Sequence, residues 1–355
     1  MIARWWERRR GSGEESAGTS APTSVGVPVG GTVLVLGVLS VLLCLVSLAV
    51  GSHSLTLEEV AGAFVPGRTT VASVIVWQLR MPRTVLAVMV GAALAVAGVV
   101  MQGLTRNPLA EPGLLGVNAG ASLSVVLSMS LLGLTDVGDF LWFAFAGAAL
   151  AAFLVHLMSV RSADAGPARL VLAGVALGAS LRSITGTVTM YDSVTFDSYR
   201  FWVLGSLADW DAALLVWVAP FLVVGLVLAL ASGLTLNALA LGEEQAKALG
   251  VSPRRARALA LTSITLLCGA STAAVGPISF VGLVVPQVLR LALGADQRKL
   301  LAVSVVAGPV LLLAADILGR VILDSGEMEA GVVTAFIGGP VLLLMVIQRM
   351  GVRGR

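Results

Sequence analysis

Three arginines stand at the edges of long apolar segments, close to acidic stretches of the chain. Arg80 and Arg83 precede one such segment, and Arg320 closes another. A guanidinium group stays charged and can hold a carboxylate through two parallel hydrogen bonds. This chemistry favours docking of an acidic partner on Arg80 and Arg83. Arginines also anchor helix ends at membrane interfaces, and Asp316 precedes Arg320 by four residues, so an internal pair is an equally good interpretation for Arg320.

A fourth arginine, Arg182, lies inside an apolar segment. It follows Arg169 by 13 positions, which is about 20 Å along a helix that rises 1.5 Å per residue. A charge at this depth in a bilayer is costly and usually faces a cavity or a partner. The alternatives are that Arg182 extends toward the membrane surface or pairs with a second subunit.

The sequence lacks the residue patterns of several kinds of catalysis. It has no GxxxxGK[ST] phosphate-binding loop, and its two lysines, Lys247 and Lys299, do not follow glycine-rich turns. His53 and His156 are too isolated to form a metal site or to serve a nucleophile as its base. We therefore expect no catalytic residue, metal or cofactor on this chain, and we expect ATP to be hydrolysed by another polypeptide.

The elements that must position these residues are membrane-spanning helices. The chain is 57% apolar and only 12% charged, which leaves too few polar residues to cover a soluble domain. Its apolar runs can cross a hydrocarbon core of roughly 30 Å, and helices are favoured because unpaired backbone groups in lipid cost several kcal/mol. We predict an all-α polytopic membrane protein with a membrane domain at 30–350 between tails at 1–29 and 351–355. The ten predicted spans are 30–50, 84–105, 114–133, 140–160, 170–190, 214–233, 255–273, 277–293, 300–320 and 331–348.

The number of spans fixes the predicted orientation. Residues 258–289 carry no charge and only Gly276-Pro277 divides them, so nine spans with one long kinked helix is the alternative. With ten spans, 17 basic residues fall on one side and five on the other, and Arg182 completes the 23. Basic residues concentrate on the cytoplasmic side. Both termini are therefore expected in the cytoplasm, whereas nine spans would separate them.

Two short helices are predicted outside the membrane. Thr56-Leu57-Glu58-Glu59 matches a capping box at the start of an outer surface helix, although an ordered loop fits equally well. On the inner side, residues 242–250 have a glycine at each end and an apolar face formed by Ala246 and Leu249. From the residues alone, this second element is an amphipathic loop helix.

Several ordered motifs along the chain resemble one family of transporters. They are Arg80-Met81-Pro82-Arg83-Thr84, Gln102-Gly103, Asn107-Pro108-Leu109-Ala110-Glu111-Pro112, Phe201-Trp202-Val203-Leu204-Gly205, Gly276-Pro277-Ile278-Ser279-Phe280, Asp316 with Arg320, and Gly331-Val332-Val333-Thr334. Together these motifs resemble the FecCD permeases, the membrane subunits of ABC importers for ferric siderophores, haem and cobalamin. The resemblance implies the type II ABC importer architecture, with ten spans and both termini cytoplasmic.

The same resemblance implies a set of partners and a cellular location. The chain would lie in a bacterial cytoplasmic membrane beside a second permease subunit, either an identical copy or a related chain. Two ATPase subunits would bind ATP and Mg²⁺, and an extracytoplasmic binding protein would deliver the substrate.

Particular residues take roles from this resemblance. Arg80, Arg83 and Arg320 match the arginines that receive carboxylates from the binding protein, and residues 234–254 match the coupling region that contacts the ATPase. The coupling residues are expected to be Gly242, Glu243, Glu244, Ala246, Leu249 and Gly250. The turn that carries the family motif is expected at Asn107, Pro108, Leu109, Ala110 and Pro112.

The fifth span carries the prediction about substrate. In the family this helix lines the translocation path at the dimer interface, so we place Arg182, Gly178 and Ser180 on that path. Close helix packing is the better interpretation for the small residues, and it does not exclude a wide path beside them. An arginine on the path favours an anionic cargo, and a ferric siderophore is the leading substrate, with cobalamin or haem as alternatives. An ion-coupled secondary transporter is the alternative from another class, but Asp316 and Arg182 are too few for a proton relay.

Overall fold

The structure is a computed structural model in which all regular secondary structure of the described residues is helical. The described ranges are 28–51, 55–65, 70–134, 136–160, 167–208, 212–323 and 326–353. The predicted tail at 1–29 lies outside them except for its last two residues. At the other terminus the last helix continues to Arg353, so the first three residues of the predicted tail at 351–355 are helical instead.

Ten helices occupy the ten predicted spans. Within the described ranges, seven helical segments are long and apolar enough to cross a membrane, and three apolar helices, α6, α14 and the described apolar part of α16, are shorter. The ten helices are α2 (Val29–Ala49), α5 (Met81–Thr105), α6 (Val117–Leu132), α7 (Val137–Val160), α8 (Pro167–Tyr191), α10 (Ala212–Ala231), α13 (Pro253–Val275), α14 (Val281–Leu293), α15 (Gln297–Val321) and α16 (Ala330–Arg353).

The chain breaks between α13 and α14, which excludes the nine-span alternative. Helix α13 ends at Gly276, whose φ of +74° suits glycine, and α14 begins after Phe280, whose φ is +70°. A side chain at Gly276 would also overlap the carbonyl oxygen of Trp202. Both the backbone angle and the close approach therefore require glycine at this break.

Shorter helices lie at the ends of the bundle. The capping-box prediction is confirmed: α3 (Leu57–Gly62) begins after Thr56, whose hydroxyl accepts a hydrogen bond from the Glu59 N–H while the Glu59 carboxylate accepts one from the Thr56 N–H. The other short elements were not predicted, except α12. They are α4 (Val71–Val74), the π-helical turn η1 (Ile75–Arg80), the 3₁₀ turn η2 (Pro112–Leu115), α9 (Ser193–Val203), α11 (Gly233–Ala240) and α12 (Glu243–Ala248).

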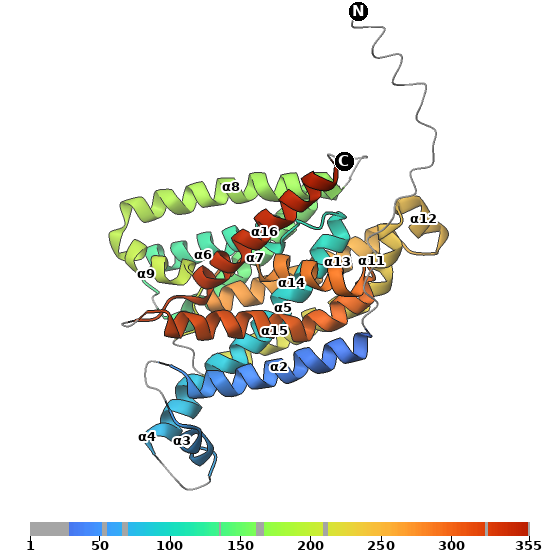
Figure 1. Ribbon diagram of the computed structural model, residues 1–355. Helices are drawn as coiled ribbons and strands as arrows, with labels where there is room; N and C mark the ends of the chain where they lie inside the picture. Colours follow the sequence, from blue (N-terminus) through green and yellow to red (C-terminus); the bar gives the residue numbers. More distant parts are fainter. Residues whose placement is uncertain are drawn as a thin grey trace, which may run out of the picture.

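Helix α5 runs through the middle of the bundle, with α2 along one edge and α8 along the opposite edge (Figure 1). Glycines let neighbouring backbones approach it closely. A Cβ added to Gly91 would lie 2.8 Å from the carbonyl of Gly308 in α15, and one added to Gly98 would overlap the backbone of Gly282 in α14. Small residues at such crossings bring helices close enough for extensive van der Waals contact. The central position of α5 thus depends on its glycines.

The periphery of the bundle is apolar. Helix α2 exposes Leu34 and Val41, and α10 exposes Val216 and Val223. Such side chains would be unfavourable in water but suit the hydrocarbon core of a membrane. Two ends of the bundle are distinguished below: the α12 end, on the right in Figure 1, and the α9 end, on the left.

Candidate functional site

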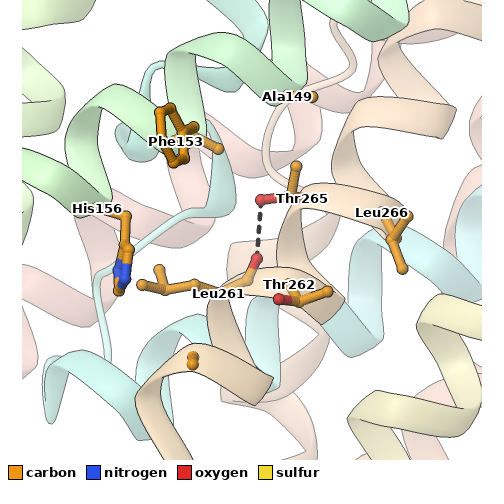
Figure 2. Close-up of a pocket in the computed structure, with 9 residues that line it drawn as sticks. Ala149, Phe153, His156, Leu261, Thr262, Thr265 and Leu266 are labelled. Carbon is orange, nitrogen blue, oxygen red and sulfur yellow. Dashed lines mark hydrogen bonds between the residues drawn. The ribbon is translucent and has the colours of Figure 1, made fainter. Parts of the chain in front are cut away.

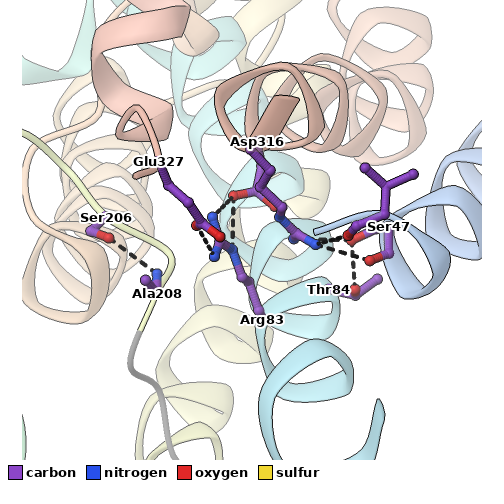
Figure 3. A network of polar contacts seen from close by, with 9 residues as sticks. Ser47, Arg83, Thr84, Ser206, Ala208, Asp316 and Glu327 are labelled. Carbon is purple, nitrogen blue, oxygen red and sulfur yellow. Dashed lines mark hydrogen bonds and ion pairs between the residues drawn. The ribbon is translucent and has the colours of Figure 1, made fainter. Parts of the chain in front are cut away.

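A cluster of charged side chains joins α2, α5 and α15 at the α9 end (Figure 3). Arg83 donates from Nε and Nη2 to Oδ1 of Asp316, over 3.0 and 2.8 Å, and from Nη1 to Oε2 of Glu327, over 2.6 Å. Arg320 pairs with Oδ2 of the same aspartate. Asp316 therefore lies between two guanidinium groups and neutralises part of the charge of each.

Arg320 also ties this cluster to the end of α2. Its Nη1 donates to the carbonyl oxygens of Ser47, over 2.9 Å, and Val50, over 3.2 Å, and its Nη2 donates to the Ser47 hydroxyl, over 3.1 Å. That hydroxyl lies 2.8 Å from the hydroxyl of Thr84 in α5. Three helices separated in sequence are thus joined by one polar network inside an apolar bundle.

The three predicted docking arginines differ in accessibility. The Asp316 side chain is fully buried, that of Arg320 is 2% exposed, and that of Arg83 is 14% exposed. Arg80 is also buried, and its Nη1 donates to the carbonyl oxygen of Leu48 over 2.7 Å. In this conformation Arg80 and Arg320 contact residues of their own chain and cannot meet a partner carboxylate. Arg83, together with the exposed Glu327, forms the accessible rim of the cluster.

The turn after α5 is held by hydrogen bonds at both of its ends. Within it, Oδ1 of Asn107 accepts from the Leu109 N–H over 3.0 Å, and the Ala110 N–H donates to the Asn107 carbonyl over 3.1 Å. Ala110 is fully buried. The predicted turn at residues 107–112 therefore has a defined geometry that a small, buried alanine permits.

Two residues absent from the predicted site attach this turn to α14. The carboxylate of Glu111 accepts a hydrogen bond from the Phe280 N–H over 2.8 Å, and the Gln287 side chain donates to the carbonyl of Pro108. Glu111 thereby satisfies an N–H at the start of α14, where a negative charge is favoured. Glu111 could have been found as an acid inside an otherwise apolar turn, but its partner 169 residues away leaves no signal in the sequence.

At the α12 end, α12 lies between two glycines with positive φ, Gly242 at +121° and Gly250 at +79°. Ala246 is buried against Ala238, Leu239 and Ala256. Leu249 is 63% exposed, so the predicted shared apolar face of Ala246 and Leu249 is wrong. The reason is that α12 ends at Ala248, and the chain turns away before Leu249 can pack inward.

The charged residues of α12 divide in the same way. Glu243 forms an ion pair with Arg257 at the start of α13, which fixes α12 to that helix. Glu244 and Lys247 lie 3.7 Å apart on the surface, and the Glu244 side chain is 91% exposed. Glu244, Lys247 and Leu249 therefore form the outward surface of this element.

Helix α8 has one packed face and one open face. A Cβ added to Gly174 would overlap the carbonyl oxygen of Leu114 in η2, and Gly178 is buried beneath the Arg182 guanidinium. Arg182 and Ser180 are exposed, and the Ser180 hydroxyl donates to the Ala176 carbonyl of its own helix, over 3.0 Å. Among the described residues, no carboxylate forms an ion pair with Arg182. Gly178 is thus buried, whereas Arg182 and Ser180 face away from the rest of the chain.

The comparisons with known proteins agree over most of the chain. Residues 38–348 match the model of the FecCD transport family. The chain is 44% identical to the ferric enterobactin transport system permease protein FepD of Escherichia coli K12, covering 85% of this chain and 91% of FepD. It is 42% identical to the vitamin B12 import system permease protein BtuC of Vibrio cholerae, covering 77% and 83%, and 38% identical to the hemin transport system permease protein HmuU of Yersinia pestis, covering 77% and 84%.

The fold is also that of a solved transporter. A metal-chelate type ABC transporter in an inward-facing conformation superposes with a TM-score of 0.79 and 28% identity, covering 90% of this chain and 99% of that one. The matched region contains the charge cluster, the 107–112 turn, α8 and α12. The chain belongs to the FecCD transport family and is a membrane-spanning permease subunit of the ABC importer type.

Proposed function

We propose that this chain is the permease of an ATP-driven importer of ferric siderophores. The observation that supports this most strongly is the family match across residues 38–348 together with the similarity to a ferric enterobactin permease. Relatives named for vitamin B12 and hemin transport make cobalamin and haem the second candidates. In this proposal the α12 end and both termini face the cytoplasm, and the α9 end faces the binding protein. The larger number of basic residues in the sequence segments predicted to lie on the inner side supports this orientation.

The docking point for the binding protein is the rim of the charge cluster. Arg83 uses two of its donors on buried Asp316 and keeps Nη1 on the accessible Glu327. A carboxylate of the binding protein that displaces Glu327 would find a guanidinium already oriented by Asp316. Arg80 and Arg320 support this point from behind by fixing the ends of α2 and α15. An arginine held in this way loses little side-chain entropy on binding.

Coupling to two ATPase subunits, which bind ATP and Mg²⁺, takes place at α12. The helix is short, its Glu243 is paired with Arg257, and its Ala246 is packed inward, so a push on α12 is transmitted to α13. Leu249 provides an exposed apolar side chain that a groove of the ATPase would bury. Burying a leucine side chain contributes about 1.5–3 kcal/mol.

The open face of α8 adjoins the second permease subunit, an identical copy or a related chain, and the translocation path. Arg182 on this face attracts an anionic chelate. A charged side chain in lipid would cost at least about 2.5 kcal/mol, so exposure of Arg182 to a polar path or a partner is favoured over exposure to acyl chains.

Uptake by proteoliposomes containing the permease, its ATPase and the binding protein tests the proposal. We expect ATP-dependent uptake of a ferric catecholate chelate, reduced at least tenfold in an Arg182→Ala protein. Cobalamin and haem are assayed in parallel. Preferential uptake of either compound would identify it, rather than a ferric siderophore, as the substrate. Uptake by the permease without any ATPase would show that the chain is an ion-coupled secondary transporter instead.

A further inference from the structure

A groove lies between α7 and α13 toward the α12 end, away from the charge cluster and from the open face of α8. Its volume is about 240 Å³, and its walls include Ala152, Phe153 and His156 from α7 and Leu261, Thr262 and Leu266 from α13 (Figure 2). The Thr265 hydroxyl, which also lines the groove, donates to the Leu261 carbonyl over 2.8 Å and so needs no further partner. The groove is thus mainly apolar, and its lining suits an apolar ligand.

The start of α13 lies one helical turn beyond the groove and is strongly basic. Arg254 and Arg255 precede the groove residue Ala258 by four and three positions, so they lie on the same side of the helix. Both are exposed. Arg257 pairs with Glu243, whereas among the described residues no carboxylate forms an ion pair with Arg254 or Arg255. Within the part of the chain that the structure describes, two positive charges without an ion-pair partner therefore stand beside the groove.

This basic start conflicts with the electrostatics of a helix. The N-terminal end of a helix carries a partial positive charge, so acids are favoured there and arginines are not. The first turn of α13 contains no acid, and the N-cap residue Ser252 makes no side-chain capping bond. By contrast, α15 begins with Asp296, whose carboxylate accepts from the Arg298 N–H over 3.0 Å. The start of α13 is therefore suited to an external anion.

We propose that this groove binds an anionic phospholipid of the inner membrane leaflet. The phosphate group lies at the start of α13 between Arg254 and Arg255, and one acyl chain fills the groove. The 12 positions from Arg254 to Leu266 span about 18 Å along the helix, close to the half-thickness of about 15 Å of a hydrocarbon core. Basic pockets between helices on the cytoplasmic side are suited to anionic lipid headgroups. The inference depends on the proposed orientation, because that orientation places the arginines in the inner leaflet.

The lipid would contact α13, the helix to which the proposed coupling element α12 is attached. Arg257 on α13 pairs with Glu243 of α12, and the lipid phosphate sits less than one turn away at Arg254 and Arg255. An occupied site would brace α13 against α7 at the end where α12 is attached. Contact of the same arginines with the ATPase is the competing explanation, and the experiment below separates the two.

Native mass spectrometry of the full-length chain in neutral detergent tests the lipid site directly. Phosphatidylglycerol and phosphatidylcholine of the same acyl length are titrated separately, with sn-glycerol 3-phosphate as the headgroup alone. We expect phosphatidylglycerol to remain bound preferentially. At about 1 kcal/mol per arginine, an Arg254→Gln/Arg255→Gln protein should bind it about 30-fold more weakly. An Ala152→Phe protein, which fills the groove, should lose binding of both lipids.

The matched control is Arg298→Gln/Lys299→Gln, which removes two charges at the start of α15 and should change phosphatidylglycerol binding less than twofold. If the two double variants lost phosphatidylglycerol binding equally, the loss would be due to overall charge and the proposal would be overturned. Phosphatidylcholine displacing phosphatidylglycerol from the unmodified protein, or glycerol phosphate displacing either lipid, would also overturn it. Normal lipid binding with failed ATPase assembly in Arg254→Gln/Arg255→Gln would assign the arginines to the ATPase instead. None of these measurements needs transport activity, so the proposed function can fail independently.

Discussion

Replacing Asp316 with alanine removes a buried carboxylate that contacts both Arg83 and Arg320. Arg83 would retain Glu327, and Arg320 would retain only the neutral oxygen atoms of Ser47 and Val50. Removing one partner of a buried ion pair destabilises a protein by about 3–5 kcal/mol, because the other charge stays buried without compensation. We expect a loss in this range, most of it from Arg320, whose side chain is only 2% exposed.

Reversible unfolding in mixed detergent micelles, followed by circular dichroism, measures this loss. The matched control is Asp197→Ala, which removes an i,i+3 pair with Arg200 whose side chains are more than half exposed. Exposed pairs contribute about 0–1 kcal/mol, so this change should be small. The double variant Asp316→Ala/Arg320→Met removes both charges and should recover much of the stability. The reasoning is refuted if Asp316→Ala lowers the free energy of unfolding no more than Asp197→Ala does. It is also refuted if the double variant loses more free energy of unfolding than its two single variants lose together.

Three further predictions concern other parts of the chain. Gly98→Ala places a methyl group against the Gly282 backbone and should destabilise the protein by about 1–3 kcal/mol in the same unfolding assay, whereas Gly186→Ala, with no atom within 4 Å of its added Cβ, should not. Leu249→Ser should weaken co-purification with the ATPase at least tenfold while leaving thermal stability unchanged, because this side chain is already exposed; unchanged co-purification would remove Leu249 from the interface. The pKa of Asp296 is lowered from its ordinary value of 3.8, chiefly by the hydrogen bond from Asn237. The ionised carboxylate therefore stabilises the fold fully above pH 3.8. This stabilisation is lost as the pH falls through the lower pKa of the folded state. The difference in free energy of unfolding between the unmodified protein and Asp296→Asn should therefore stay constant near neutral pH and become smaller below pH 3.8.

Much of the fold follows from local sequence. Ten apolar runs predict ten helices because each run must satisfy its own backbone hydrogen bonds in lipid. The Thr56 capping box predicts the start of α3 for the same kind of local reason, since both of its partners lie within four residues. Gly276 marks the break between α13 and α14, because its positive φ and its contact with Trp202 both favour glycine.

The candidate site was predicted less completely. The i,i+4 pair of Asp316 with Arg320 could be read from spacing alone, and it formed. The contact of Arg83 with the same aspartate could not, because 233 residues separate them. The exposed position of Leu249 was also missed, since helical periodicity assumes that the helix continues and α12 ends one residue earlier.

The sequence by itself determined that this chain is a helical membrane permease, which residue types stand at its helix ends, and where the short helix proposed as the coupling element lies. These properties depend on composition, short-range spacing and ordered motifs. Only the tertiary structure decided which charges share a partner, that Arg80 and Arg320 are buried while Arg83 reaches the surface, and that a groove opens beside the basic start of α13. Those outcomes depend on how α2, α5, α7, α13 and α15 pack, and packing brings together residues whose separation along the chain carries no record of their contact.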